Sequence, residues 1–128
     1  AEAVIEGCDS NGCEYMTGGT VVILGKVGDN FAAGMTGGMA FVYDKKNEFE
    51  NYVNPNSVIW QIPETSFWKN YLQNLIKEHY KETQSKIAKD IIDNFDSELK
   101  NFKQICPKEM LDKLLNPLTL KKRLSKAI

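Results

Sequence analysis

The sequence of 128 residues is poor in the residue types from which most catalytic and metal sites are built. It contains three cysteines (Cys8, Cys13 and Cys106) and one histidine, His79. An odd and sparse set of cysteines does not form a disulfide framework, so we expect a protein of a reducing compartment, the cytoplasm. Structural zinc normally takes four nitrogen or sulfur ligands, and a cysteine nucleophile needs an adjacent base. We therefore predict no metal-binding and no catalytic residue.

Other functional classes are excluded by what the sequence lacks. It has no run of 18 apolar residues, so we expect no membrane-spanning segment. The net charge is −1, which provides no overall basic field for nucleic acid or for an acidic membrane surface. The glycine-rich segment GKVGDN at 25–30 does not match the pattern of a phosphate-binding loop. We therefore predict no cofactor-binding residue in this chain, and neither nucleic acid nor membrane as a partner.

What the sequence does contain is an internal repeat with a period of 19 residues. Met-Thr-Gly-Gly occurs at 16–19 and again at 35–38. Four apolar runs follow the same period: AEAVIE at 1–6, TVVILG at 20–25, MAFVYD at 39–44 and VIWQIP at 58–63. Their valine, isoleucine, phenylalanine and tyrosine residues favour strands, and the period is too short for a helix-pair repeat. We therefore predict a single-stranded right-handed β-helix, a short solenoid of coils of about 19 residues, with its strands stacked in register.

The repeated residues are the predicted corners of this solenoid. Paired glycines allow the backbone to bend with positive φ at each corner, and stacked asparagines can form an amide ladder. The predicted structural corners are Gly18, Gly19, Gly37, Gly38, Asn11 and Asn30. The fourth coil departs from the pattern at 54–57, where Pro55 cannot donate to a strand ladder. A plain β-meander with coincidental glycines is the alternative.

The second half of the sequence has helical spacing. Thr65 or Ser66 is expected to cap a first helix, a second stretch runs from 87 to 102 with a break near Asn94, and Pro107 is expected to begin a third. We predict β-helix coils over 1–64, incomplete at their N-terminal side, and a helical tail over 65–128 that shields one end of the solenoid. Because an open end needs a cover, we expect either a fragment of a longer solenoid or a chain that sits against a partner.

The residues from Gly12 to Asp44, GCEYMTGGTVVILGKVGDNFAAGMTGGMAFVYD, resemble the C-terminal glycine-rich (GXGXG) β-helix domain of the large subunit of glutamate synthase. The later segments EHYKETQSKIAKDIIDNF and FKQICPKEM are similar to the helical tail of that subunit.

This resemblance implies a part of an oxidoreductase that makes two glutamates from glutamine and 2-oxoglutarate. The catalytic cysteine, the FMN site and the iron–sulfur cluster ligands would lie upstream, so none is assigned to this chain. The implied role is structural: to hold the glutaminase and FMN synthase domains, its expected partners, in a fixed geometry. The alternatives are a free-standing β-helix module that binds a protein or small ligand, as in a related formylmethanofuran dehydrogenase subunit, and a thiol enzyme that uses Cys13.

Overall fold

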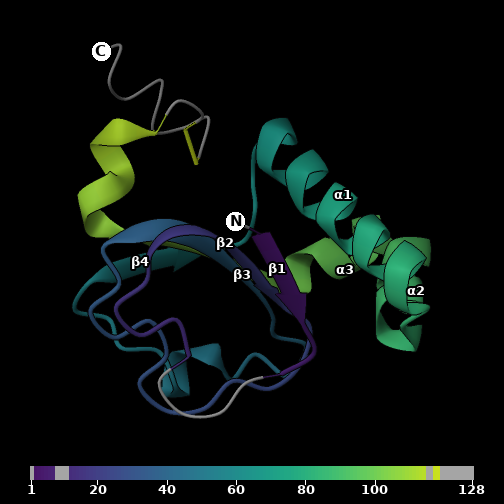
Figure 1. The fold of residues 1–128 in the computed structure, drawn as a ribbon, viewed down its shortest axis with the longest axis horizontal. Coiled ribbons are helices and arrows are strands. Elements are labelled where there is room, and N and C mark those ends of the chain that lie inside the picture. Colours follow the sequence, from purple (N-terminus) through teal and green to yellow (C-terminus); the bar gives the residue numbers. More distant parts are fainter. Residues whose placement is uncertain (1, 8–11, 115–116, 119–128) are drawn as a thin grey trace.

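A mixed five-stranded sheet lies at the centre of the fold (Figure 1). The computed structural model describes residues 2–7, 12–114 and 117–118. The strands are β1 (Glu2–Ile5), β2 (Thr17–Ile23), β3 (Gly37–Tyr43), β4 (Val58–Gln61) and β5 (Phe102–Pro107). They lie in the order β1-β2-β3-β5-β4, with β1, β2 and β3 parallel and β5 antiparallel to both of its neighbours. Four of the five strands overlap the four apolar runs of the repeat, and β2 and β3 begin before their runs, in the glycine motif.

The first three strands stack with nearly the period of the sequence repeat. Ala3 lies opposite Val21, a shift of 18 residues, and Val21 lies opposite Ala40, a shift of 19. An irregularity between Thr17 and Thr20 changes the shift at the beginning of β3. Residues one repeat apart in the sequence therefore lie opposite, or almost opposite, each other on neighbouring strands.

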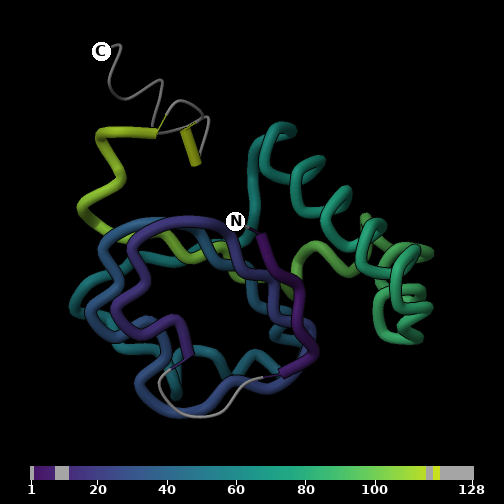
Figure 2. Tube along the Cα trace, viewed as in Figure 1, coloured from purple at the N-terminus to yellow at the C-terminus, as the bar shows by residue number. Residues whose placement is uncertain are grey.

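The loops that connect these strands also pair from one turn to the next. The backbone N–H of Tyr15 donates to the carbonyl of Ala33 at 2.8 Å, and that of Phe31 donates to the carbonyl of Tyr52 at 2.9 Å. Phe31 also forms a parallel bridge with Val53. In Figure 2 the chain from residue 12 to β4 runs in successive rings that overlie one another. Each turn thus contacts the next along its loop as well as along its strand.

The fourth apolar run does not continue this stack. Ile59 of β4 lies opposite Cys106 of β5, and Gln104 of β5 lies opposite Phe41 of β3. The prediction that 58–62 lies in register on the strand before it is therefore wrong, because a strand from the second half of the chain separates the two.

The same segment corrects the helix prediction. The sequence predicts Phe102 in a helical stretch, whereas Phe102–Pro107 is β5. Pro107 is the last residue of this strand and the N-cap of the 3-10 turn Lys108–Lys113, so a helical turn does follow it, but not an α-helix. Alternate residues of this strand face opposite sides of the sheet and almost all are buried. A short run that is buried on both faces cannot be distinguished from a helix by its apolar spacing alone.

The helices begin and end at identifiable signals. They are α1 (Ser66–Thr83), α2 (Lys86–Asp93) and α3 (Phe95–Glu98), with 3-10 turns η1 (Phe49–Asn51), η2 (Leu99–Asn101) and η3 (Lys108–Lys113). Thr65 caps α1 by accepting the N–H of Trp68 at 3.5 Å, and Ser85 caps α2. Asn94 ends α2 and precedes α3, so the cap at Thr65 and the break near Asn94 are confirmed.

The sheet separates two apolar cores. The helix-side core lies between the sheet and α1–α3 and includes Val22, Phe41, Leu72, Ile91 and Phe102. The coil-side core fills the interior of the turns and includes Ile23, Phe31, Val42, Phe49 and Ile105. The helices therefore cover a face of the sheet rather than one end of the stack, where most of β1 remains exposed. No helix formed by the described residues has the length and hydropathy to cross a bilayer.

Gln104 supplies a test of the packing around β5. Its side chain is fully buried, and its Oε1 has no hydrogen-bond partner among the described residues, while its Nε2 lies 3.5 Å from the sulfur of Met39. Replacing it by an apolar side chain of similar length removes an unsatisfied buried acceptor. We expect Gln104→Met to leave the free energy of unfolding in urea unchanged or to raise it by about 1–2 kcal/mol. Ile105→Ala, which opens a cavity on the opposite face, should lower it by about 2–5 kcal/mol. A clear loss of stability in Gln104→Met would contradict this description.

Candidate functional site: glycine contacts between the turns

Glycines lie where one turn touches the next. Gly37 and Gly38 begin β3, and Gly18 and Gly19 are the second and third residues of β2. A Cβ added at Gly37 would lie 2.1 Å from the carbonyl oxygen of Thr17, and one at Gly38 would lie 2.8 Å from that of Gly19. These distances are shorter than any ordinary Cβ contact. The second copy of the repeated motif therefore lets two backbones approach each other directly.

Gly25 forms another close backbone contact between turns, and the sequence analysis does not predict it. A Cβ at Gly25, just after β2, would lie 2.0 Å from the carbonyl oxygen of Glu6, 19 residues earlier. At Gly18, in contrast, no atom of a described residue lies within 4 Å of such a Cβ. Among the described residues, the turn before Gly37 therefore approaches its backbone directly, and nothing approaches Gly18.

Left-handed backbone recurs with the same period. The pairs with positive φ are Cys13 and Ala32 (58° and 64°), Tyr15 and Gly34 (55° and 66°), and Gly19 and Gly38 (81° and 84°). Side chains rarely adopt this conformation, so its recurrence shows that two turns follow one backbone course. In the sequence only glycines indicate a left-handed backbone, because cysteine, tyrosine and alanine have no preference for positive φ.

Of the two asparagines predicted as corners, the structure describes Asn30 but not Asn11. Asn30 is exposed and has a φ of 57°, in the left-handed region that asparagine tolerates. Asn11 lies outside the described residues, so the amide ladder between the two stays a prediction.

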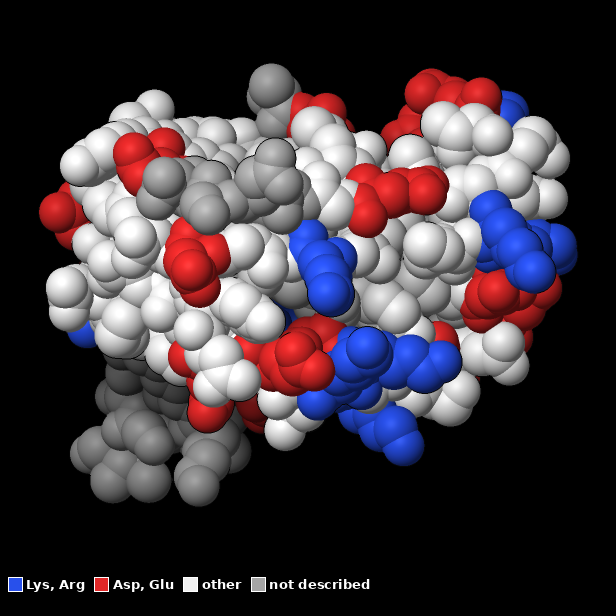
Figure 3. Space-filling view, turned by 90° about the horizontal axis from the view of Figure 1, so that it is seen from below, with Lys and Arg blue, Asp and Glu red and all other residues white. Residues whose placement is uncertain are grey.

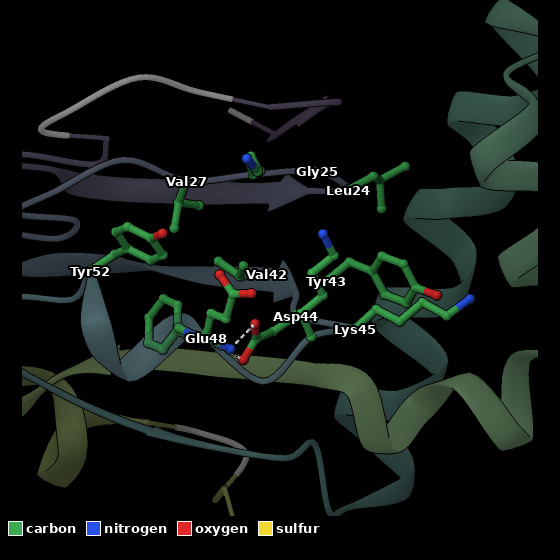
Figure 4. Close-up of a pocket in the computed structure, with 12 residues that line it drawn as sticks. Leu24, Gly25, Val27, Val42, Tyr43, Asp44, Lys45, Glu48 and Tyr52 are labelled. Atoms are coloured by element: carbon green, nitrogen blue, oxygen red, sulfur yellow. Dashed lines mark hydrogen bonds between the residues drawn. The ribbon is translucent and has the colours of Figure 1, made fainter.

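A cavity of about 210 Å³ opens where the second and third turns leave the sheet (Figure 4). Its apolar lining includes Val27, Val42 and Phe49. Asp44, at its edge, accepts the backbone N–H groups of Glu48 at 2.8 Å and Phe49 at 3.1 Å. This carboxylate therefore holds the turn after β3.

Polar side chains tie the helices to the first turn. The Nε2 of His79 lies 3.1 Å from a carboxylate oxygen of Glu6. Hydrogen bonds from Ser85 and from His79 lower the pKa of Glu6. The imidazole thus joins α1 to the carboxylate of a residue that follows β1.

Two tyrosines hold carboxylates on the helix side. The hydroxyl of Tyr43 donates to Glu98, while that of Tyr71 donates to Glu2 and lies 2.9 Å from the hydroxyl of Thr20. Burial, and then the hydrogen bond to the carboxylate, raises the pKa of both phenols. Both remain protonated at neutral pH and serve as donors that join separate elements.

The residues do not fit an iron–sulfur cluster. Such clusters are held by several cysteine thiolates gathered at one site, and this sequence has three cysteines. Cys106 is buried in the helix-side core, and Cys13 packs against the coil-side core. Across residues 2–7, 12–114 and 117–118, no group of three or more histidine, cysteine or acidic side chains is placed to hold a metal ion.

Charged side chains of both signs share the surface. On the face seen in Figure 3, basic and acidic side chains lie next to one another, and large areas carry neither. On this face the mixture provides no continuous basic surface of the kind that nucleic-acid backbones require.

Comparison with known proteins identifies a protein family for most of the chain. Residues 1–108 match the family model described as the GXGXG motif. The chain is 54% identical over 125 residues to the glutamate synthase (NADPH) large chain of Azospirillum brasilense, which covers 98% of this chain and 8% of that protein. It is 43% identical over 109 residues to the glutamate synthase (NADH) of Schizosaccharomyces pombe, covering 85% of this chain and 5% of the relative. It is 45% identical over 107 residues to the chloroplastic ferredoxin-dependent glutamate synthase of Spinacia oleracea, covering 84% and 7%. The chain thus spans less than a tenth of the length of these relatives.

The two copies of the glycine motif provide a matched pair of variants. Gly37→Ala places a methyl group against the carbonyl of Thr17, so the turns must separate. We expect it to lower the free energy of unfolding by about 1–3 kcal/mol or more. Gly18→Ala meets no atom of the described residues and has no positive φ to strain, so its effect should stay within about 1 kcal/mol and can be stabilising. Urea unfolding of both variants checks this, and equal losses would show that turn spacing does not depend on Gly37.

The Glu6–His79 pair predicts a pH dependence. The folded-state pKa of Glu6 lies below its ordinary value of 4.5, so its contribution is present above that pH and is lost as the pH falls through the folded-state value. Glu6→Gln should lower stability at neutral pH by less than about 1 kcal/mol, because the carboxylate is partly exposed. The difference from the parent chain should vanish in acid. A difference that stays constant with pH would contradict the charged pair.

Proposed function

Because the chain belongs to the GXGXG family, we propose that it is a structural, non-catalytic region of a glutamate synthase large subunit. The complete enzyme would convert glutamine and 2-oxoglutarate into two molecules of glutamate. The proposal is supported by the names of the relatives and by the small part of each relative that the chain covers. The iron–sulfur cluster would be bound by another domain, since Cys13 and Cys106 lie in cores on opposite sides of the sheet. FMN would be bound by another domain as well.

The proposed role is to hold the glutaminase and FMN synthase domains at a fixed separation. Ammonia released at one site must reach the other without escaping to water, which requires a scaffold of constant dimensions. The observation that carries this role is the direct approach of backbones at Gly25, Gly37 and Gly38. No side chain lies between the turns there, so their spacing follows from backbone geometry and leaves little freedom for the turns to slide.

We assign the stacked turns to a short right-handed β-helix in which Gly18, Gly19, Gly37, Gly38, Asn11 and Asn30 form the corners. Right-handed crossovers are the strong preference for parallel strands. Residues 1–64 would form the coils and 65–128 the tail, which is joined to them by β5. The partners would be the other domains or subunits of glutamate synthase, and the location would be the cytoplasm, although some relatives are chloroplastic.

The proposal is tested in the intact large subunit that carries this segment. Gly37→Ala should increase the ammonia released into solution for each glutamate formed, because the domains lose their fixed separation. The measurement compares glutamine hydrolysed with glutamate produced in the presence of 2-oxoglutarate. Glu109→Gln, which changes an exposed side chain on η3, is the control and should leave the ratio unchanged.

Two outcomes would contradict the scaffold. One is an unchanged ratio in a Gly37→Ala enzyme whose unfolding is measurably weakened. The other is glutamate formation by the isolated chain, which would mean that it carries catalytic residues of its own. Saturable binding of a small metabolite to the isolated chain in calorimetry would instead favour a free-standing ligand-binding module.

A further inference from the structure

The cavity between the second and third turns is produced by a difference in length between two loops. Ile23 of β2 lies opposite Val42 of β3, a shift of 19 residues, whereas Phe31 pairs with Val53 further along the same turns, a shift of 22. The loop after β3 is therefore three residues longer than the loop after β2, and it contains η1. The two loops separate after the sheet and meet again at Phe31, and the cavity lies between them.

Both walls of this cavity belong to the chain itself. The second turn contributes residues 24–27, and the third turn contributes residues between 42 and 52. Among the described residues, none before Leu24 lines it. The cavity is therefore a property of two successive turns and does not depend on the residues that precede β1.

The apolar part of the cavity is held in place by aromatic packing. Phe49 is buried, and its ring makes edge contacts with Phe31 at 5.6 Å and with Trp60 at 5.8 Å between ring centroids. Val27 and Val42 line the cavity with it. An apolar cavity of about 150 Å³ is large enough for benzene, so a volume of about 210 Å³ can take one aromatic ring.

The charged groups around the cavity favour an acidic neighbour for this ring. Lys26, Lys45 and Lys46 line it, are exposed and form no ion pair with a described residue. In Figure 4, Lys45 extends away from Val42. Glu48 is half-buried and is a lining carboxylate without an ion pair among the described residues. An uncharged ring therefore suits the interior, and carboxylates suit the lysines around it.

We propose that this cavity receives an aromatic side chain from another segment of the large subunit, and that acidic residues beside this side chain lie against the three lysines. A ring buried in a preformed pocket is a typical anchor of a protein interface, and opposite charges around it determine which partner binds and in which orientation. This inference rests on the proposed function, and it specifies the chemistry by which a neighbouring domain is fixed to the turns.

The test measures the binding of three short peptides to the complete 128-residue chain through the NMR shifts of its backbone amides. The first peptide carries phenylalanine between aspartates, the second has alanine in place of phenylalanine, and the third has lysines in place of the aspartates. The first should bind at least about tenfold more tightly than either of the others, because only it supplies both the ring and the carboxylates. The shifts should centre on Val27 and Phe49.

Two variants examine the interior of the cavity. Val27→Phe places a ring of the chain's own in the space, so it should weaken the aspartate–phenylalanine peptide by at least about tenfold. Glu48→Gln removes a carboxylate that repels the acidic peptide, so it should strengthen binding. Urea unfolding verifies that both variants are folded.

A matched pair of double variants examines the lysines. Lys26→Gln with Lys46→Gln should weaken the acidic peptide and reduce the dependence of its binding on salt. Lys108→Gln with Lys113→Gln changes the net charge equally at exposed positions that do not line the cavity, and it should leave binding unchanged. Equal weakening by the two double variants would show that only the net charge of the chain matters.

The intact large subunit supplies the last comparison. Its own segment should already fill the cavity, so the aspartate–phenylalanine peptide should bind the isolated chain but not the intact subunit. The inference is overturned if the three peptides bind equally or not at all, if Val27→Phe binds as the parent chain does, or if the intact subunit binds the peptide as tightly as the isolated chain. Failure of the scaffold role is separate, because it is measured by the ratio of glutamine hydrolysed to glutamate formed in the Gly37→Ala enzyme and does not involve the peptides.

Discussion

The fold depends on how closely two backbones can approach. In most sheets the distance between strands is set by hydrogen bonds and the loops are free to diverge. Here the loops and strand ends of successive turns are also in contact, and at Gly25 and Gly37 a carbonyl oxygen occupies the place of a side chain. Any other residue at those positions forces the turns apart. The interior of the stack, the course of the loops and the position of β3 all follow from this constraint.

The central strands are buried on both faces because the stack has an inside and an outside. Val22 and Phe41 pack under the helices, whereas Ile23 and Val42 pack within the turns. This explains why the strands read as nearly continuous apolar runs rather than as alternating patterns, which is typical of parallel sheets covered on both sides. The helices thus complete the sheet, and tyrosine–carboxylate hydrogen bonds join the two layers at Tyr43 and Tyr71.

Much of the first half of the fold could be predicted from the sequence, because the 19-residue period is a property of the backbone course itself. The period located the first three strands and their parallel order, and Thr65 located the first helix cap. The 19-residue period could not locate β5, because the pairing of Phe102–Pro107 with strands distant in sequence leaves no periodic pattern. The left-handed residues Cys13 and Ala32 were also missed, since tertiary packing overrides the intrinsic preference of these residue types.

The place of β5 has a consequence for how the chain acquires its structure. The three parallel strands are separated by fewer than twenty residues, but β5 must travel back from beyond α1–α3 to enter between β3 and β4. Contacts between distant segments close large loops and slow folding. During synthesis the early turns would emerge from the ribosome well before the strand that completes their sheet. Until then β3 has an unpaired edge and both cores lack one wall, so this interval is when the nascent chain is most exposed to misassociation.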